Sequence, residues 1–260
     1  MESYNKTAQN RAIQELAAME TPEKWLAYRK EQLTPILGIL DEEKSAPIAE
    51  FLNKRFMDAA LACGAMQIKD KWKTLLDTEK TAFAQNIVNT LVDLLTQDIQ
   101  NDRLTLYNGR GEVYQPSNPQ IANVYKNEIL KYIRNDLKIT ALPYNKGLMA
   151  ISATGKLIIN LKWELYKSID FFLRDLRHEM MHMVDILIPQ ISPMDPEVRG
   201  KAIRYYVSCY ESGPEDFYKK NPLELHANFK QVEFMVLCGE TLQTLSTNRL
   251  QKLKQKIAVR

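Results

Sequence analysis

Two histidines and a glutamate are the residues of this chain best suited to metal chemistry. The chain has only three histidines in 260 residues. Two of them, His178 and His182, lie four positions apart, and Glu179 follows the first. On an α-helix, residues i and i+4 share one face, so both imidazoles can bind a single metal ion while the glutamate lies beside it. The spacing predicts a helical zinc site.

Zinc chemistry accounts for these residue types. Zinc binds imidazole nitrogen at about 2.0–2.1 Å, and a catalytic zinc has three protein ligands and a fourth position for water. Bound water loses its proton near neutral pH, and a carboxylate at the position of Glu179 can accept that proton and later deliver it to a leaving amine. We therefore expect one Zn²⁺ ion, with Glu179 as general base.

A purely structural role for the histidines is the alternative, because imidazoles on a helix also form ordinary hydrogen bonds. The flanking residues favour the metal site. Leu176 and Val184 are uncharged, as are Met180, Met181 and Met183. This is expected for a helix buried in a core with one polar stripe turned to a cleft, and the methionines are expected to pack beneath it.

Two residues further along the chain are candidates for the third ligand. Glu224 and His226 follow Pro222, which favours a helix start at this point. They are two positions apart, so on a helix they point to nearly opposite sides. Only one of them can face the metal, and both carboxylate and imidazole are competent zinc ligands.

The combined pattern resembles the gluzincin group of zinc metallopeptidases, within the zincin superfamily. In that group an HExxH motif is followed on a second helix by Glu-x-x-Ala, here Glu224-Leu225-His226-Ala227. The resemblance implies that Glu224 is the third ligand and that the small Ala227 lets the two helices approach. It covers roughly residues 145–235. It implies a zinc metalloendopeptidase that hydrolyses peptide bonds of a protein or peptide substrate.

The metzincin pattern fits less well. It needs glycine three residues after the second histidine and another histidine six residues after it, whereas this chain has Asp185 and Ile188.

Four further residues are candidates for supporting the reaction. Asp185 lies three residues after His182 on the same helical face, where its carboxylate is expected to accept the second N–H of a ligand imidazole. A solvated aspartate near a helix end is the alternative. Tyr205, Tyr206 and Tyr210 are candidate donors to the oxyanion of the transition state, with structural packing as the alternative.

The elements before the motif must position it. Two short apolar runs, at 148–152 and 156–161, flank Ala153-Thr154-Gly155 and predict a β-hairpin. A long helix is expected from about Trp163 to Ile188, where Pro189 stops it. An exposed strand beside that helix would let a peptide substrate add to the sheet.

The residues before the hairpin predict helices and carry no chemical motif. Helical periodicity and start signals place helices after Pro22, over about 48–65, over 77–100 and over about 121–135, with a loop at 101–119. We expect an N-terminal helical lobe at 1–103 and a zincin-like metallopeptidase domain at 104–260. The expected fold class is mainly helical α+β, with a small sheet and the HExxH active-site helix.

Composition bounds the partners and the compartment. A net charge of +3 without single-sign blocks argues against a nucleic-acid partner. The three cysteines form no CxxC pair, which argues against a disulfide framework. No signal-type segment or membrane-length apolar run is present, so we expect no membrane span and a cytoplasmic protein, or one exported without a cleavable signal as a bacterial effector or toxin-type protease.

A different class of function competes with the peptidase. In that alternative the chain is a helical protein-interaction module, and its zinc site is structural or inactive.

Overall fold

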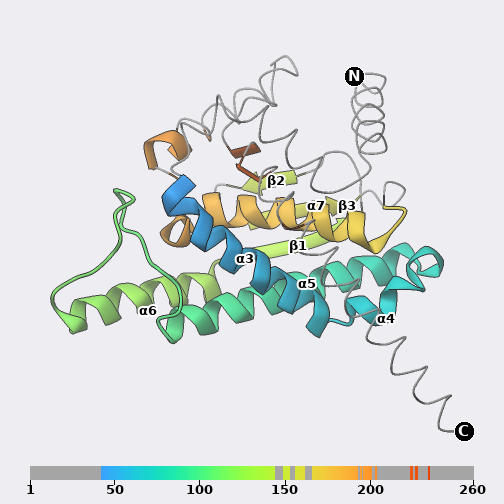
Figure 1. Cartoon of the computed structure of the whole chain (residues 1–260), viewed down its shortest axis with the longest axis horizontal. Coiled ribbons are helices and arrows are strands. Elements are labelled where there is room, and N and C mark those ends of the chain that lie inside the picture. Colours follow the sequence, from blue (N-terminus) through green and yellow to red (C-terminus); the bar gives the residue numbers. More distant parts are fainter. Residues whose placement is uncertain are drawn as a thin grey trace, which may run out of the picture.

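The computed structural model is mainly helical with a small three-stranded sheet, as the sequence predicts for the fold class (Figure 1). It describes residues 42–143, 149–152, 156–161 and 166–192, together with 194, 196–200, 203, 223, 224, 226, 227 and 234. The helices and strands, in chain order, are α3 (Glu42–Ala62), α4 (Ala65–Lys69), η1 (Trp72–Thr74), α5 (Asp77–Gln100), α6 (Pro119–Asn135), β1 (Lys138–Pro143), β2 (Met149–Ser152), β3 (Lys156–Leu161), α7 (Ile169–His182), η3 (Met183–Leu187) and η4 (Pro189–Ile191).

The helix predicted over 48–65 corresponds to α3, which begins six residues earlier and ends at Ala62, because Gly64 takes a left-handed conformation (φ 87°) before the short helix α4. The bounds of α5 are the expected ones, because its apolar face repeats at helical spacing along its whole length. Helix α6 begins at Pro119, two residues before the predicted start, since the Asn118 side chain accepts a hydrogen bond from the backbone N–H of Gln120. The helix start predicted at Pro22 lies outside the described residues.

The sheet contains the predicted hairpin and one strand that was not predicted. Its order is β1-β3-β2, and β2 pairs with β3 antiparallel, which confirms the hairpin. The additional strand, β1, pairs with β3 in parallel. Its exposure alternates along the strand, from exposed Thr140 to buried Ala141 to exposed Leu142. This is the period-two signal of a half-buried strand, but it is short and ends in a proline.

The outer edge of β1 is closed by one side chain from α5. The backbone N–H of Ala141 donates to Gln85 Oε1 at 2.8 Å, and Gln85 Nε2 donates to the carbonyl of Ile139 at 3.0 Å. The side-chain amide thus satisfies the two backbone groups as a neighbouring strand would. This protects an edge that would otherwise be open to pairing with another chain.

One hydrophobic core joins the segments on both sides of residue 104. A single cluster of buried residues includes Phe56 of α3, Ile87 of α5, Leu157 of β3, and Leu176 and Met181 of α7. Helix α3 contacts both α5 and α7, and α5 contacts β1 (Figure 1). The early helices therefore support the motif helix directly, while the division into domains at 1–103 and 104–260 stays a prediction.

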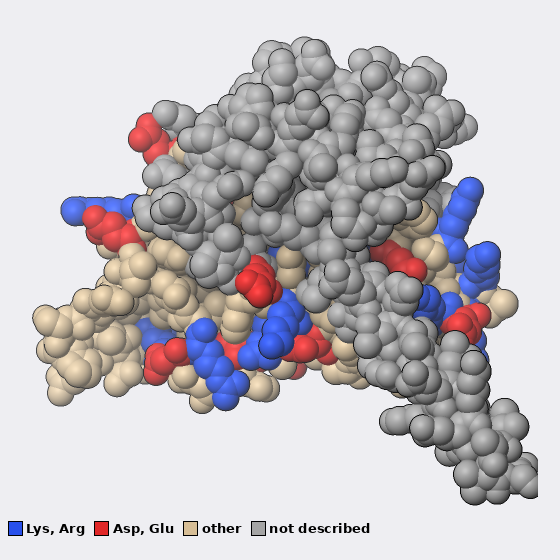
Figure 2. Space-filling model, in the orientation of Figure 1, with Lys and Arg blue, Asp and Glu red and all other residues tan. Residues whose placement is uncertain are grey.

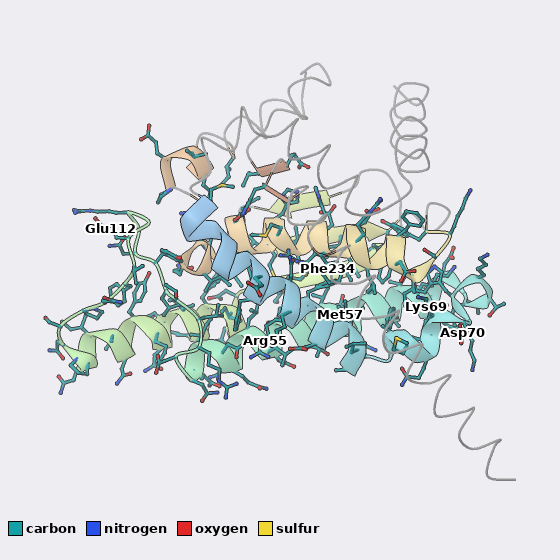
Figure 3. All side chains as sticks on the ribbon, viewed as in Figure 1. Arg55, Met57, Lys69, Asp70, Glu112 and Phe234 are labelled. Carbon is teal, nitrogen blue, oxygen red and sulfur yellow. The ribbon has the colours of Figure 1, made fainter. Side chains whose placement is uncertain are left out.

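Two polar contacts fix α3 against its neighbours. Arg55 donates to Asp98 of α5 through Nε at 2.6 Å and through Nη2 at 2.9 Å, and these hydrogen bonds raise the pKa of Arg55 (Figure 3). On α7, Arg177 Nε donates to Asn53 Oδ1 at 2.8 Å in the buried interior. Both contacts give α3 a defined rotation against α5 and α7.

The described surface mixes charges of both signs. On the face in Figure 2, basic and acidic side chains alternate, and neither sign forms a continuous patch over the described residues. Among the helices of the described ranges, none has the length and apolarity that crossing a membrane requires.

The Gln85 contact predicts a specific loss of stability. Gln85→Leu should lower the free energy of unfolding by about 1–3 kcal/mol, because two backbone groups lose partners that contribute about 0.5–1.5 kcal/mol each. Denaturant unfolding measures this change. Asn89→Ala is the matched control, since it removes only the exposed partner of the same amide at 2.9 Å. If both variants unfold at the same denaturant concentration, Gln85 does not stabilise the strand edge.

Candidate metal centre

The motif lies at the end of a buried helix that is shorter than predicted. Helix α7 begins at Ile169, six residues after the expected start, because the Ser168 side chain caps it by accepting a hydrogen bond from the N–H of Phe171. After His182 the backbone widens into the π-helical turn η3, closed by the Ile188 N–H to Met183 carbonyl bond at 3.1 Å. The α-helix thus ends six residues before the predicted end at Ile188, and the helical backbone continues only as this π turn to Leu187, two residues before Pro189.

The two motif histidines converge on one point. Their Nε2 atoms are 3.1 Å apart, and the ring planes of His178 and His182 are inclined at 84° with centroids 4.8 Å apart. The side chain of His178 is 11% exposed and that of His182 is 2% exposed. One imidazole therefore borders the surface and the other is buried.

Glu224 reaches the same point from a distant part of the chain. Residues 223, 224, 226 and 227 have helical backbone, as predicted after Pro222. Glu224 Oε2 is 3.2 Å from His178 Nε2, and Glu224 Oε1 is 3.3 Å from His182 Nε2. One nitrogen or oxygen ligand atom from each of these three residues lies within 4.8 Å of the others. Of the two candidates for the third ligand, the structure brings Glu224 to the histidines.

The three side chains fit a zinc ion. Ligand atoms at about 2.0–2.1 Å from a tetrahedral ion lie about 3.3 Å from one another, close to the separations of 3.1–3.3 Å found here. Both oxygens of Glu224 are buried and have no hydrogen-bond partner among the described residues. Buried carboxylate oxygens without donors are suited to a cation, and two imidazoles with one carboxylate are a zinc-type ligand set.

The electrostatics of the group favour positive charge at its centre. Burial disfavours the ionised form of Glu224, but the imidazole of His182 and then that of His178 hold its pKa below the usual value. Burial also opposes a charged His182, yet Glu224 raises the pKa of that imidazole to about 9. Without a metal, a proton on the imidazole balances the carboxylate. A cation bound between these side chains would take over that role.

Glu179, the candidate general base, has a carboxylate in a buried and charged environment. Its Oε2 atom is buried and has no hydrogen-bond partner in the described part of the chain. Burial raises the pKa of Glu179, and the charges of His178 and His182 oppose that rise. A carboxylate whose pKa is moved towards neutrality is better suited to both accepting and returning a proton.

Asp185 has a different partner from the one expected. The prediction that it accepts an N–H from a ligand imidazole is not met at His182, whose Nδ1 has no partner among the described residues. Asp185 Oδ2 instead lies 2.8 Å from His226 Nδ1, and Asp185 Oδ1 accepts from Ser192 Oγ at 2.5 Å. The π-helical turn carries Asp185 on a backbone that departs from the α-helical register used for the prediction.

Tyr205, Tyr206 and Tyr210 lie outside the described residues. Ser192 was not singled out by the sequence, because a lone serine after Pro189 follows no recognisable pattern. Its role becomes visible only once the turn η4 brings it against Asp185.

Comparison with known proteins finds no relative. No protein-family model matches the chain, and neither the curated proteins nor the solved structures contain a match.

The geometry predicts which residues bind metal. Glu224→Ala should weaken zinc binding more than about 100-fold, which exceeds the loss usual for residues that only support a ligand. Affinity is measured by competition with a coloured chelator on protein stripped of metal. Glu128→Ala, at an exposed glutamate of α6, is the control and should bind zinc as wild type does. Equal affinities for the two variants would remove Glu224 from the ligand set.

Proposed function

We propose that the protein is a zinc-dependent metallopeptidase of the gluzincin type, which hydrolyses peptide bonds in a protein or peptide substrate. The observation that carries the proposal is the convergence of His178, His182 and Glu224, with their facing atoms 3.1–3.3 Å apart. Two histidines and a glutamate are one of the ligand sets of catalytic zinc.

The number of ligand side chains found among the described residues, three, favours a catalytic zinc site over a structural one. Structural zinc sites are closed by four protein ligands, usually including cysteine. Among the described residues, the candidate set consists of His178, His182 and Glu224. The only cysteine of the described ranges, Cys63, instead lies 3.3 Å from Thr90 Oγ1 on α5. The fourth position is then left for water or for the substrate carbonyl.

Each residue of the site has a distinct task in the proposed reaction. Zinc, when bound, polarises the scissile carbonyl and makes water more acidic. His178, His182 and Glu224 hold it. Glu179 accepts the proton of the attacking water at its carboxylate and then donates it to the amine that leaves, so the glutamate ends the cycle as it began.

The sheet suggests where the substrate lies. Of the two edge strands, β1 already has its edge hydrogen-bonded to Gln85. This favours β2 as the strand to which an extended peptide adds its backbone hydrogen bonds. Buried residues of β3, the strand paired with β2, and of α7 belong to one core cluster, which supports placing a bound peptide on the same side of the fold as the motif.

The second candidate function is the helical interaction module with a structural or inactive zinc site. The shared core gives it some support, because α3 and α5 form a continuous packed unit with α7. Peptide hydrolysis by the zinc-loaded protein distinguishes the two candidate functions, because the interaction module would show none.

Glu179→Gln tests catalysis. The variant should retain one equivalent of zinc, because Glu179 is not a ligand, and should lose peptide hydrolysis by about 10²–10⁴-fold, the usual contribution of a general base. Wild type and variant are incubated with a peptide library prepared from a proteome, and new peptide termini are counted by mass spectrometry. The exposed Glu128→Ala variant serves as control.

Three results would contradict the proposal. Zinc-loaded wild type that generates no new termini favours the interaction module. Equal cleavage by Glu179→Gln removes this glutamate from the mechanism. Loss of zinc from Glu179→Gln makes Glu179 part of the metal site.

A further inference from the structure

A second buried polar group lies beside the metal-binding residues and is not part of them. It consists of Asp185, His226 and Ser192, which are 0%, 1% and 1% exposed. Ser192 Oγ donates to Asp185 Oδ1 at 2.5 Å, and Asp185 Oδ2 pairs with His226 Nδ1 at 2.8 Å. Ser192 Oγ also accepts from the backbone N–H of Met194 at 3.2 Å. Both carboxylate oxygens are therefore engaged within this network.

The network joins the two chain segments that carry the ligands. Asp185 is three residues after His182 in the turn that continues α7, and His226 is two residues after Glu224. A second contact holds the later segment, because the ring of Phe234 packs edge-on against Phe56 of α3 at 4.9 Å (Figure 3). The chain after Glu224 is thus held against the scaffold at two points, His226 and Phe234.

Glu224 needs such an anchor more than the histidines do. The histidines project from a continuous helix that is packed into the core. In contrast, Glu224 comes from a separate segment, and its two oxygens face His178 and His182 at 3.2 and 3.3 Å. The carboxylate can make these two contacts only if its backbone is held at the right place.

We propose that Asp185 and His226 form a positioning pair that fixes the segment bearing Glu224, so that its carboxylate faces His178 and His182 before metal binds. Ser192 holds Asp185 in the orientation that this contact needs. His226 acts through its Nδ1 atom and is not a ligand, because residues two apart on a helix point to nearly opposite sides. The inference rests on the proposed metal site and names the residues that preorganise it.

Two substitutions of His226 separate this role from metal binding through Nε2. Asparagine can place its amide N–H near the position of Nδ1 and so keep the contact with Asp185, whereas alanine removes the contact. His226→Ala should weaken zinc binding about 10–100-fold, the usual effect of losing a residue that orients a ligand. His226→Asn should stay within about threefold of wild type, on the reasoning that the oriented donor is retained. Chelator competition measures both affinities, and the visible absorption of the cobalt-substituted proteins reports the ligand geometry.

A remote buried substitution controls for general destabilisation. Asp98→Asn weakens the contact between α5 and Arg55, so it should lower the unfolding temperature of the metal-free protein without changing its zinc affinity. If His226→Ala does not fold, Asp185→Asn replaces it. This variant keeps the side-chain shape and should also weaken zinc binding about tenfold, within the range for orienting residues.

The outcomes distinguish this inference from the proposed function. Wild-type zinc affinity in His226→Ala or in Asp185→Asn overturns the positioning pair and leaves the metal site standing. Equal losses in His226→Asn and His226→Ala also overturn it, because they assign the contribution to Nε2. A parallel loss of affinity in Asp98→Asn assigns the effect to overall stability and overturns it as well. Wild-type protein that binds no zinc overturns both proposals.

Discussion

A carboxylate buried between two imidazoles is the interaction on which the rest of this structure depends. Glu224 is 1% exposed, and removing an ionised carboxylate from water costs several kcal/mol unless positive charge compensates it. His178 and His182 provide that compensation at 3.2 and 3.3 Å. The requirement is demanding because the partners lie far apart in sequence, so both segments must be placed accurately for the charge to be tolerated.

The scaffold meets this requirement by holding the motif helix from several directions. The buried Arg177 side chain connects α7 to Asn53 on α3, and α3 is in turn bonded to α5 through Arg55 and Asp98. Apolar packing of α3, α5 and α7 surrounds these contacts in one cluster. The helices before residue 104, which carry no chemical motif, therefore take part in presenting the histidines. Their shared packing suits a site whose ligand atoms must be placed to within a few tenths of an ångström.

Local patterns predicted the elements well, and long-range partners poorly. The bounds of α5 and the β2–β3 hairpin follow from residue periodicity and turn composition, which act within a few neighbouring residues. The pairing of β1 with β3 does not, because the two strands are separated along the chain and the strand signal of β1 is short. Likewise, the helical spacing of His178 and His182 identified the site. The contact of Asp185 with His226 depends on a π-helical turn and on a distant segment, neither of which a helical wheel represents.

The arrangement also links metal binding to stability. Glu224 and Glu179 bury oxygens that have no hydrogen-bond partner among the described residues, so the metal-free protein retains a cluster of acidic groups at a cost to its stability. A ligand that binds only the folded state adds stability that grows with its concentration, by about 4 kcal/mol at a thousand times the dissociation constant. Zinc would then stabilise the very segment whose placement creates its site. In this proposal, Glu224 and His226 lie on opposite sides of one helical turn and have different roles. In the proposed arrangement, the histidine would hold the backbone when no metal is bound, and the glutamate would bind the ion from that fixed position.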